Sequence, residues 1–242
     1  METGSPAAAI SAPKHGKDGP LPPLLLVLTM ITGLVDAVSY LELGHVFVAN
    51  MTGNIVFLGF AAAGAPGLSV PASLAAIGAF LAGALAGGRL ALHFSGHRGR
   101  FLAIASYIML ALIGAALLVS IGGHNYDDDI LRYALIVLLA LAMGLQNAAV
   151  RRLSVSDLTT TVLTLTLTGI AADSRLAGGT NPNVGRRLAG TATMLPGAAV
   201  GAVLIRFIGV SAVLALVFAL LAVNAIVAYR LSSSTEAWTS PG

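Results

Sequence analysis

Eight apolar runs follow one another along the chain, separated by short stretches that hold most of the charged residues. They lie near residues 24–43, 46–63, 71–92, 101–121, 131–150, 158–173, 187–206 and 208–229. A bilayer core of about 30 Å needs a helix of about 20 apolar residues, so the pattern predicts an all-α integral membrane protein. The two weakest runs are also the polar ones, and they contain VANMTGNIVFLG and LTTTVLTLTLTG.

The arginines distinguish two ways of threading these runs through a membrane. If all eight cross from a cytoplasmic N-terminus, the arginines between 89 and 100 are external and the acidic run 127–129 is internal. That arrangement contradicts the positive-inside rule. If the two weak runs enter and leave by the same side, all arginines except Arg132 and Arg206 become cytoplasmic. We therefore predict about six spanning helices plus two re-entrant or broken segments, with eight full crossings as the alternative.

Composition supports the membrane assignment and bounds the domains. Hydrophobic residues make up 57% of the chain and charged residues only 10%, against about 25% charged residues in soluble domains. The polar ends are too short to fold alone. We divide the chain into a disordered cytoplasmic tail (1–22), a first membrane repeat (23–122), a second membrane repeat (131–230) and a cytoplasmic tail (231–242). The chain has no cysteine, which excludes disulfides and thiolate-bound metals.

An internal repeat with a period of 111 to 114 residues relates the two halves. TGLVDAV at Thr32 aligns with MGLQNAAV at Met143. Under the threading with six crossings the two halves enter the membrane from opposite sides, so the repeat is inverted. Many secondary transporters are built from inverted repeats with broken helices, and their substrate site lies near the midplane. Some channels share that plan. The aligned pairs are Gly33 with Gly144, Asp36 with Asn147, Thr52 with Thr164, Asn54 with Thr166, Gly83 with Gly197, and Gly87 with Gly201.

Asp36 is the most unusual residue of the first helix. A carboxylate near the middle of a spanning helix costs about 2.5 to 3.5 kcal/mol on insertion scales and is by default functional. It predicts a proton or cation site; the alternative is an Asp that bonds hydroxyls or backbone where two helices cross. Its repeat partner Asn147, next to Gln146, keeps the polarity without the charge.

The polar residues around Gly53 predict a cavity in the membrane. Broken backbone at membrane depth is tolerated only where it faces protein or water, although such residues also bond neighbouring helices in a solid bundle. We expect Gly53 to break the helix with a positive φ, and the half-helix after it to point its positive end at the cavity. The candidate residues for binding a solute or ion are Asp36, Asn50, Thr52, Gly53, Asn54, Gln146, Asn147, Thr164 and Thr166. The glycines of the two G-x-x-x-G patterns, Gly83, Gly87, Gly197 and Gly201, are candidates for close helix packing.

Other chemistry finds little support in the sequence. His93 and His97 have the spacing of a metal pair but no third ligand nearby. A solvated outer loop accounts for His124 and the aspartates 127–129. The chain contains no G-x-S-x-G, no H-E-x-x-H and no P-loop. We therefore expect no enzymatic activity, no metal, no cofactor and no nucleic-acid partner.

The segment TGLVDAVSYLELGHVFVANMTGNIVFLGFA, from Thr32 to Ala61, resembles the YoaK-type family of bacterial membrane proteins. Its members show a similar G-[FY]-x-D-A followed by M-T-G-N, and the likeness covers nearly the whole chain. The resemblance implies a multi-spanning inner-membrane protein of unknown function, with Asp36 and residues 51–54 at the signature positions. Family members often have T-G-T where this chain reads Thr164, Leu165, Thr166, so the second short segment departs from that pattern.

Three functions remain open at this point. The first is a transporter for a small solute or ion, with proton or cation coupling at Asp36. The second is a passive channel of the same architecture, and the third is a membrane scaffold or interaction protein without a pathway. The expected partners are the lipid bilayer, an unknown small solute or ion, and a second copy in a homo-oligomer. The expected location is the bacterial inner (plasma) membrane, with both termini in the cytoplasm.

Overall fold

The structure is a computed structural model that describes residues 18–94, 96–123, 128–155, 163–180 and 184–240. Within these ranges the chain is helical and contains no strand, which confirms the predicted all-α class. The elements are α1 (Leu21–Glu42), α2 (Met51–Ala62), α3 (Val70–His93), α4 (Arg98–Gly122), α5 (Asp129–Leu153), α6 (Leu163–Ala172), η1 (Arg175–Ala177), α7 (Val184–Phe207), α8 (Val210–Leu231) and η2 (Ala237–Thr239). Six helices among them, α1, α3, α4, α5, α7 and α8, are long and apolar enough to cross a membrane.

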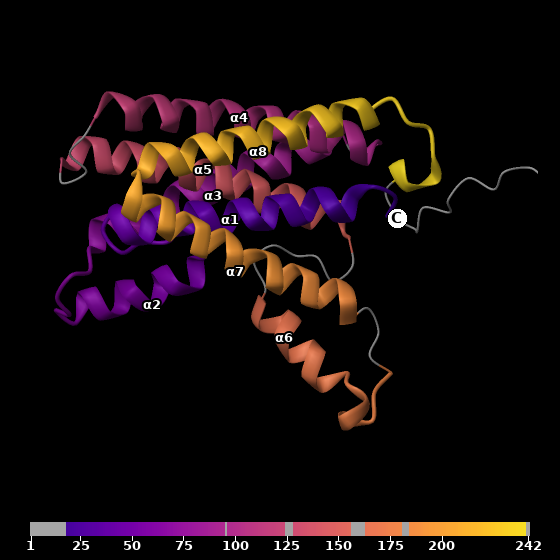
Figure 1. Ribbon diagram of the computed structural model, residues 1–242, viewed down its shortest axis with the longest axis horizontal. Coiled ribbons are helices and arrows are strands. Elements are labelled where there is room, and N and C mark those ends of the chain that lie inside the picture. The colour runs from indigo at the N-terminus through magenta and orange to yellow at the C-terminus, as the bar shows by residue number, and fades with distance from the viewer. Residues whose placement is uncertain (1–17, 95, 124–127, 156–162, 181–183, 241–242) are drawn as a thin grey trace, which may run out of the picture.

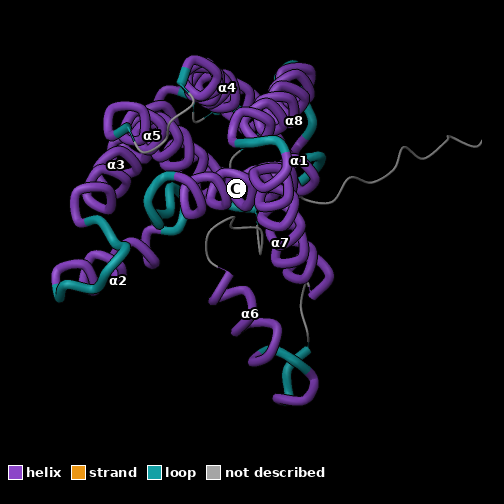
Figure 2. Tube along the Cα trace, turned by 60° about the vertical axis from the view of Figure 1, so that its left-hand side comes forward, coloured by secondary structure: helices purple, strands orange, loops and turns teal. Residues whose placement is uncertain are grey.

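The two weak apolar runs form the short helices α2 and α6. They have 12 and 10 residues, which at a rise of about 1.5 Å per residue reaches about 15 to 18 Å, half of a bilayer core. α2 begins alongside the bundle and runs outward to one of its ends, whereas α6 projects away from the other helices beside α7 (Figures 1 and 2). The predicted plan of six long helices and two short segments therefore matches the described helices.

Three helix pairs form the bundle: α1 with α7, α3 with α5, and α4 with α8. Glycines bring the first two pairs together. A Cβ added at Gly197 would collide with the carbonyl oxygen of Met30, and one at Gly83 would collide with that of Leu141. Gly87 and Gly201 each face an alanine Cβ of the partner helix, at 2.8 and 2.9 Å from the added atom. The four predicted packing glycines thus all lie at helix contacts.

Gly33 and Gly144 lie on the opposite sides of the same contacts, although we identified them only as markers of the repeat. A Cβ at Gly33 would lie 2.5 Å from the carbonyl oxygen of Met194, and one at Gly144 would collide with that of Phe80. Each of these two tight contacts therefore has glycines on both of its helices, and one helix of each contact comes from each half of the chain.

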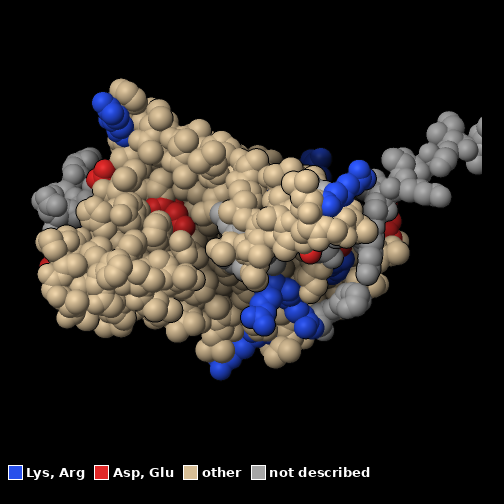
Figure 3. All heavy atoms as spheres, turned by 90° about the horizontal axis from the view of Figure 1, so that it is seen from below, with Lys and Arg blue, Asp and Glu red and all other residues tan. Residues whose placement is uncertain are grey.

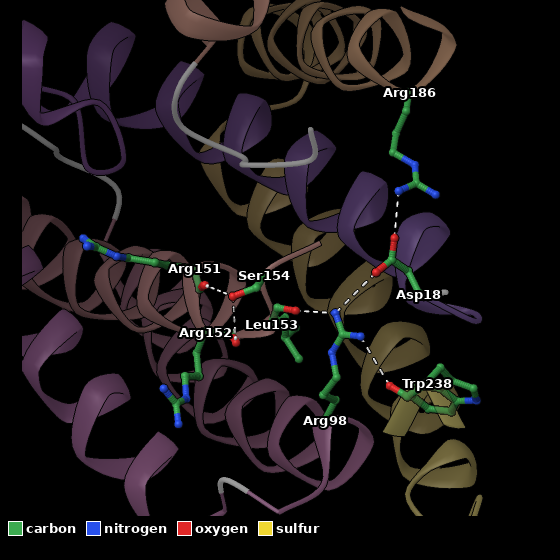
Figure 4. A network of polar contacts seen from close by, with 8 residues as sticks. All are labelled: Asp18, Arg98, Arg151, Arg152, Leu153, Ser154, Arg186 and Trp238. Carbon is green, nitrogen blue, oxygen red and sulfur yellow. Dashed lines mark hydrogen bonds and ion pairs between the residues drawn. The ribbon is translucent and has the colours of Figure 1, made fainter. Parts of the chain in front are cut away.

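Charged residues tie the helix ends together at one end of the bundle (Figure 4). Arg98, at the start of α4, donates hydrogen bonds to the carbonyl oxygens of Leu153 and Trp238 and pairs with Asp18 at 3.6 Å. Asp18 also pairs with Arg186 at 2.8 Å. Basic residues gather at this end of the molecule (Figure 3).

This network shortens the disordered tail that we assigned to residues 1–22. Asp18 is buried, and Arg98 and Arg186 pair with its carboxylate. α1 begins soon after it, at Leu21. The C-terminal tail is also partly ordered, since η2 places Trp238 in a buried position with 4% of its surface exposed. Residues 1–17 of the tail lie outside the described part of the chain.

Candidate functional site

A pocket of about 370 Å³ lies where α1, the segment 43–50, α2, α6 and α7 meet. Five of the nine candidate residues line it. The lining residues are Thr32, Asp36, Ala49, Asn50, Thr52, Gly53, Val56, Phe57, Thr164 and Met194. Segments separated by more than a hundred positions in the sequence therefore meet around one mixed polar and apolar space.

Among the described residues that line this pocket, Asp36 is the only charged one. Its side chain is 5% exposed. Oδ1 accepts hydrogen bonds from the backbone N–H groups of Val48, at 3.2 Å, and Ala49, at 3.0 Å. Oδ2 is buried and has no hydrogen-bond partner among the described residues. One oxygen therefore anchors the segment before α2, and the other is buried without a hydrogen-bond partner among the described residues.

The segment between α1 and α2 turns sharply and is held by aromatic rings. Gly44 and His45 have positive φ, 93° and 55°. Tyr40 stacks on Phe47 with ring centroids 5.0 Å apart, and Phe47 stacks on Phe57 at 5.7 Å. These contacts join the end of α1 to α2 and bring the backbone N–H groups of the segment to Asp36.

The expected helix break at Gly53 is wrong. α2 begins at Met51 with Asn50 as its N-cap, and Gly53 lies in its first turn without a positive φ. The turn is made by Gly44 and His45 instead. Gly53 is small for another reason: an added Cβ would lie 2.7 Å from the ring of Phe47.

Asn54 does not line the pocket. It is fully buried, and its amide bonds the backbone of Phe47 in both directions: Oδ1 accepts from the N–H at 2.8 Å, and Nδ2 donates to the carbonyl oxygen. Asn54 therefore positions the segment that carries the pocket wall.

Neither Gln146 nor Asn147, two candidates of the second half, lines the pocket. Gln146 is buried, and Nε2 donates to the hydroxyl of Thr32 at 2.8 Å and to the carbonyl oxygen of Leu28 at 3.3 Å. Asn147 donates to the carbonyl oxygen of Met143 in its own helix. Gln146 thus contacts the pocket residue Thr32 from behind, and Asn147 has turned to its own backbone.

The second short helix contributes one residue to the pocket. Thr164, at the start of α6, lines it, whereas Thr166 does not. The first turn of α2 reaches the same space through Thr52 and Gly53. The N-terminal ends of two short helices, which carry partial positive charge, therefore face the pocket that holds the Asp36 carboxyl group.

Sequence reasoning missed five of the lining residues: Thr32, Ala49, Val56, Phe57 and Met194. Thr32 lies four residues before Asp36, so helical periodicity places both on one face of α1 and could have identified it. Phe57 and Met194 are ordinary apolar residues of α2 and α7, and no local sequence signal distinguishes them.

The two histidines with metal-pair spacing have separate roles. Nδ1 of His93 lies 3.0 Å from the carbonyl oxygen of Arg89, whereas His97 caps α4 through the N–H of Arg100 and contacts the carbonyl oxygen of Ser234. Within the described ranges, no group of three His, Cys, Asp or Glu side chains could hold a metal ion.

Comparison with known proteins identifies the family. The model of the family described as "Protein of unknown function (DUF1275)" matches residues 24–227, so the chain belongs to this family. The UPF0700 transmembrane protein YoaK of Bacillus subtilis (strain 168) is 36% identical over 151 residues, which cover 62% of this chain and 65% of that protein. No solved structure matches. The resemblance to the YoaK-type family is thereby confirmed, and the chain is a multi-pass membrane protein of an uncharacterised family.

Proposed function

We propose that this member of the DUF1275 family is a transporter for a small solute or ion, which binds in the pocket beside Asp36. The observation that carries the proposal is the Oδ2 atom of Asp36, buried without a hydrogen-bond partner in the described structure and next to a pocket of about 370 Å³. An unpaired carboxylate inside a membrane protein is costly and marks ion or substrate pathways in proteins that have them.

The packing of the helices supports an inverted repeat. If α1 to α4 are matched in order with α5 to α8, the contact of α1 with α7 corresponds to that of α5 with α3, and the α4–α8 contact corresponds to itself. Gly33 and Gly197 join the first pair as Gly144 and Gly83 join the second. The same exchange relates the contact of α2 with α3 to that of α6 with α7.

The helix directions agree with this symmetry. Arg98 at the start of α4 contacts Leu153 at the end of α5, and Asp18 before α1 contacts Arg186 near the start of α7. The starts of α1, α4 and α7 thus lie at the same end of the bundle as the end of α5. α1 and its counterpart α5 consequently run in opposite directions, as an inverted repeat requires.

A passive channel of the same architecture is the second candidate function. It would also need a polar pocket, and the opposing N-terminal ends of α2 and α6 suit either mechanism. The unpaired Oδ2 atom favours a carrier, because a binding site that holds its ligand through a charge slows free passage. A scaffold without a pathway leaves both the pocket and the unpartnered oxygen without a role.

Ligand-induced stabilisation of the purified protein tests the proposal. A ligand at 100 times its Kd stabilises the folded state by about 2.7 kcal/mol, so a screen of small solutes should raise the Tm by several degrees for a true ligand. Asp36→Asn keeps an oxygen for the N–H groups of Val48 and Ala49 and removes only the charge. We expect this variant to remain folded and to lose the response.

Asp129→Asn, an exposed acid at the start of α5, is the matched control and should respond as the parent does. An equal response of Asp36→Asn and the parent to every ligand found would contradict a site at Asp36.

We further propose the orientation in the inner membrane, with both termini in the cytoplasm. The chain has no cysteine to remove, so single cysteines report the side directly. Ala63→Cys, between α2 and α3, should be labelled only from outside, and Thr235→Cys only from the cytoplasm. Labelling of Ala63→Cys from the cytoplasm alone would show that α2 crosses the membrane, as in the alternative with eight crossings.

A further inference from the structure

We infer that the pocket exchanges one proton for one small organic cation at the Oδ2 atom of Asp36. This inference rests on the proposed function and names its substrate class and its mode of coupling. It follows from the number of charged groups in the pocket, from the hydrogen bonds of Asp36 and from the chemistry of the remaining wall.

Asp36 must balance the charge of any ion in this pocket by itself. Among the described lining residues, those from the segment 43–50, α2, α6 and α7 include no other titratable or charged side chain. The nearest titratable neighbours along the chain are Tyr40, Glu42 and His45, and none of them lines the pocket. Tyr40 and His45 pack on each other with ring centroids 5.2 Å apart. α5 faces this region with the neutral side chain of Gln146. The described residues of the site therefore offer one negatively charged side chain and no positive one, and the partial positive charge at the N-terminal ends of α2 and α6 lies beside them.

The two oxygens of Asp36 have different roles. Oδ1 is occupied by the N–H groups of Val48 and Ala49, whereas Oδ2 has no partner among the described residues. An unpaired charge inside a low-dielectric region costs several kcal/mol, so an empty pocket is stable with a proton on Oδ2. A ligand cation at Oδ2 replaces that proton, which leaves to water, and the occupied pocket stays neutral.

Because the Oδ2 atom of Asp36 is one shared binding position, the protein would exchange a proton for a cation and would not carry both together. Proton and cation compete for the same oxygen, so each leaves when the other binds. Joint transport needs a second acid in the pocket, and the described lining residues include none besides Asp36. The repeat counterpart of Asp36 is Asn147, which is neutral and bonded to its own helix. One negative charge therefore couples the two fluxes in opposite directions.

The rest of the wall suits an organic cation better than a bare metal ion. Hard metal ions require about six oxygen ligands. The Thr32 hydroxyl already donates to Leu28 and accepts from Gln146, and the Asn50 side chain caps Gly53. The apolar residues Ala49, Val56, Phe57 and Met194 form much of the wall. An ammonium group at Oδ2 with an apolar body against Phe57 and Met194 satisfies both parts of the pocket.

Three probes of nearly the same shape separate charge from size: benzylamine, benzyl alcohol and benzoate. We expect purified protein to bind benzylamine saturably, more tightly than the other two, and to release about one proton per molecule bound in weakly buffered detergent solution. In the range where Asp36 holds a proton, the apparent Kd should rise about tenfold for each unit by which the pH falls. Asp36→Asn should bind benzylamine at least tenfold more weakly and release no proton.

The outcomes distinguish this inference from the proposed function. Benzylamine binding without proton release, absence of saturable benzylamine binding, or tighter binding of benzoate or benzyl alcohol, would overturn the exchange of a proton for a cation. If benzyl alcohol or benzoate bound the parent and failed to bind Asp36→Asn, the proposed solute site at Asp36 would stand and only the proton-for-cation exchange would fall. Equal binding of all probes to the parent and to Asp36→Asn would overturn both proposals.

Discussion

Gly144→Ala is expected to destabilise the protein by about 3 kcal/mol, the upper end of the usual cost of overpacking. The added Cβ would collide with the carbonyl oxygen of Phe80 and lie 2.9 Å from the backbone nitrogen of Ala84. Backbone atoms cannot rotate away as a side chain does, so α3 and α5 must separate. The Tm of the purified protein, measured by the loss of monodisperse material on heating, should fall by several degrees.

Gly88→Ala is the matched control, because this exposed glycine of α3 has nothing within 4 Å of an added Cβ. Alanine is a better helix former than glycine by about 0.5 to 1 kcal/mol, so the control should be unchanged or slightly stabilised. Gly33→Ala, which meets α7 in the equivalent way, should resemble Gly144→Ala. A Gly144→Ala protein as stable as Gly88→Ala would show that α3 and α5 do not approach each other so closely.

Arg98→Ala should cost about 1 to 3 kcal/mol, as expected when buried hydrogen-bonding groups lose their partner, because Asp18 keeps its ion pair with Arg186. The Arg98 side chain is 10% exposed and contacts Asp18 and the carbonyl oxygens of Leu153 and Trp238 (Figure 4). Its loss leaves these groups without their shared donor. Arg98→Lys should rescue only part of the stability, because a lysine ammonium cannot reproduce the planar fork of the guanidinium.

Trp238 makes the local effect measurable, since it is the single tryptophan of the chain and is 4% exposed. Release of the C-terminal segment in Arg98→Ala should shift its emission to longer wavelength. Arg151→Ala serves as the control, because the Arg151 side chain is exposed and points away from this network (Figure 4). Unchanged emission and Tm in Arg98→Ala would show that the network does not hold the segment.

Hydrophobic pattern predicted most of the fold. The placement of the arginines and the polar residues of the two weak runs separated the six long helices from α2 and α6, because positive residues favour the cytoplasmic side of a membrane. The order of glycines and polar residues predicted an internal repeat, and G-x-x-x-G patterns predicted the contacts at Gly83 and Gly197. The prediction erred where backbone conformation depends on distant partners. The turn before α2 is made by Gly44 and His45, and Gly53 is small because the Phe47 ring packs against it.

The candidate site was predictable in part. A carboxyl group in a spanning helix is costly wherever it lies, so Asp36 was identifiable without any partner. That Asp36 and Thr164 line the same pocket was not predictable, because the crossing of helices from the two halves decides which side chains share a cavity. The same holds for Asn54, whose amide turned to the backbone of Phe47.

The sequence by itself determined the class of protein, the number of long apolar helices and the presence of an unusual acid in the first of them, because these depend on local composition and on the thickness of the membrane. The tertiary structure alone decided that Oδ1 of Asp36 is occupied and Oδ2 is unpaired among the described residues. It also decided that Asp18, Arg98 and Arg186 share one network. Hydrogen bonds and ion pairs depend on distances of a few ångströms between residues far apart in the chain, and only the packing of the helices sets those distances.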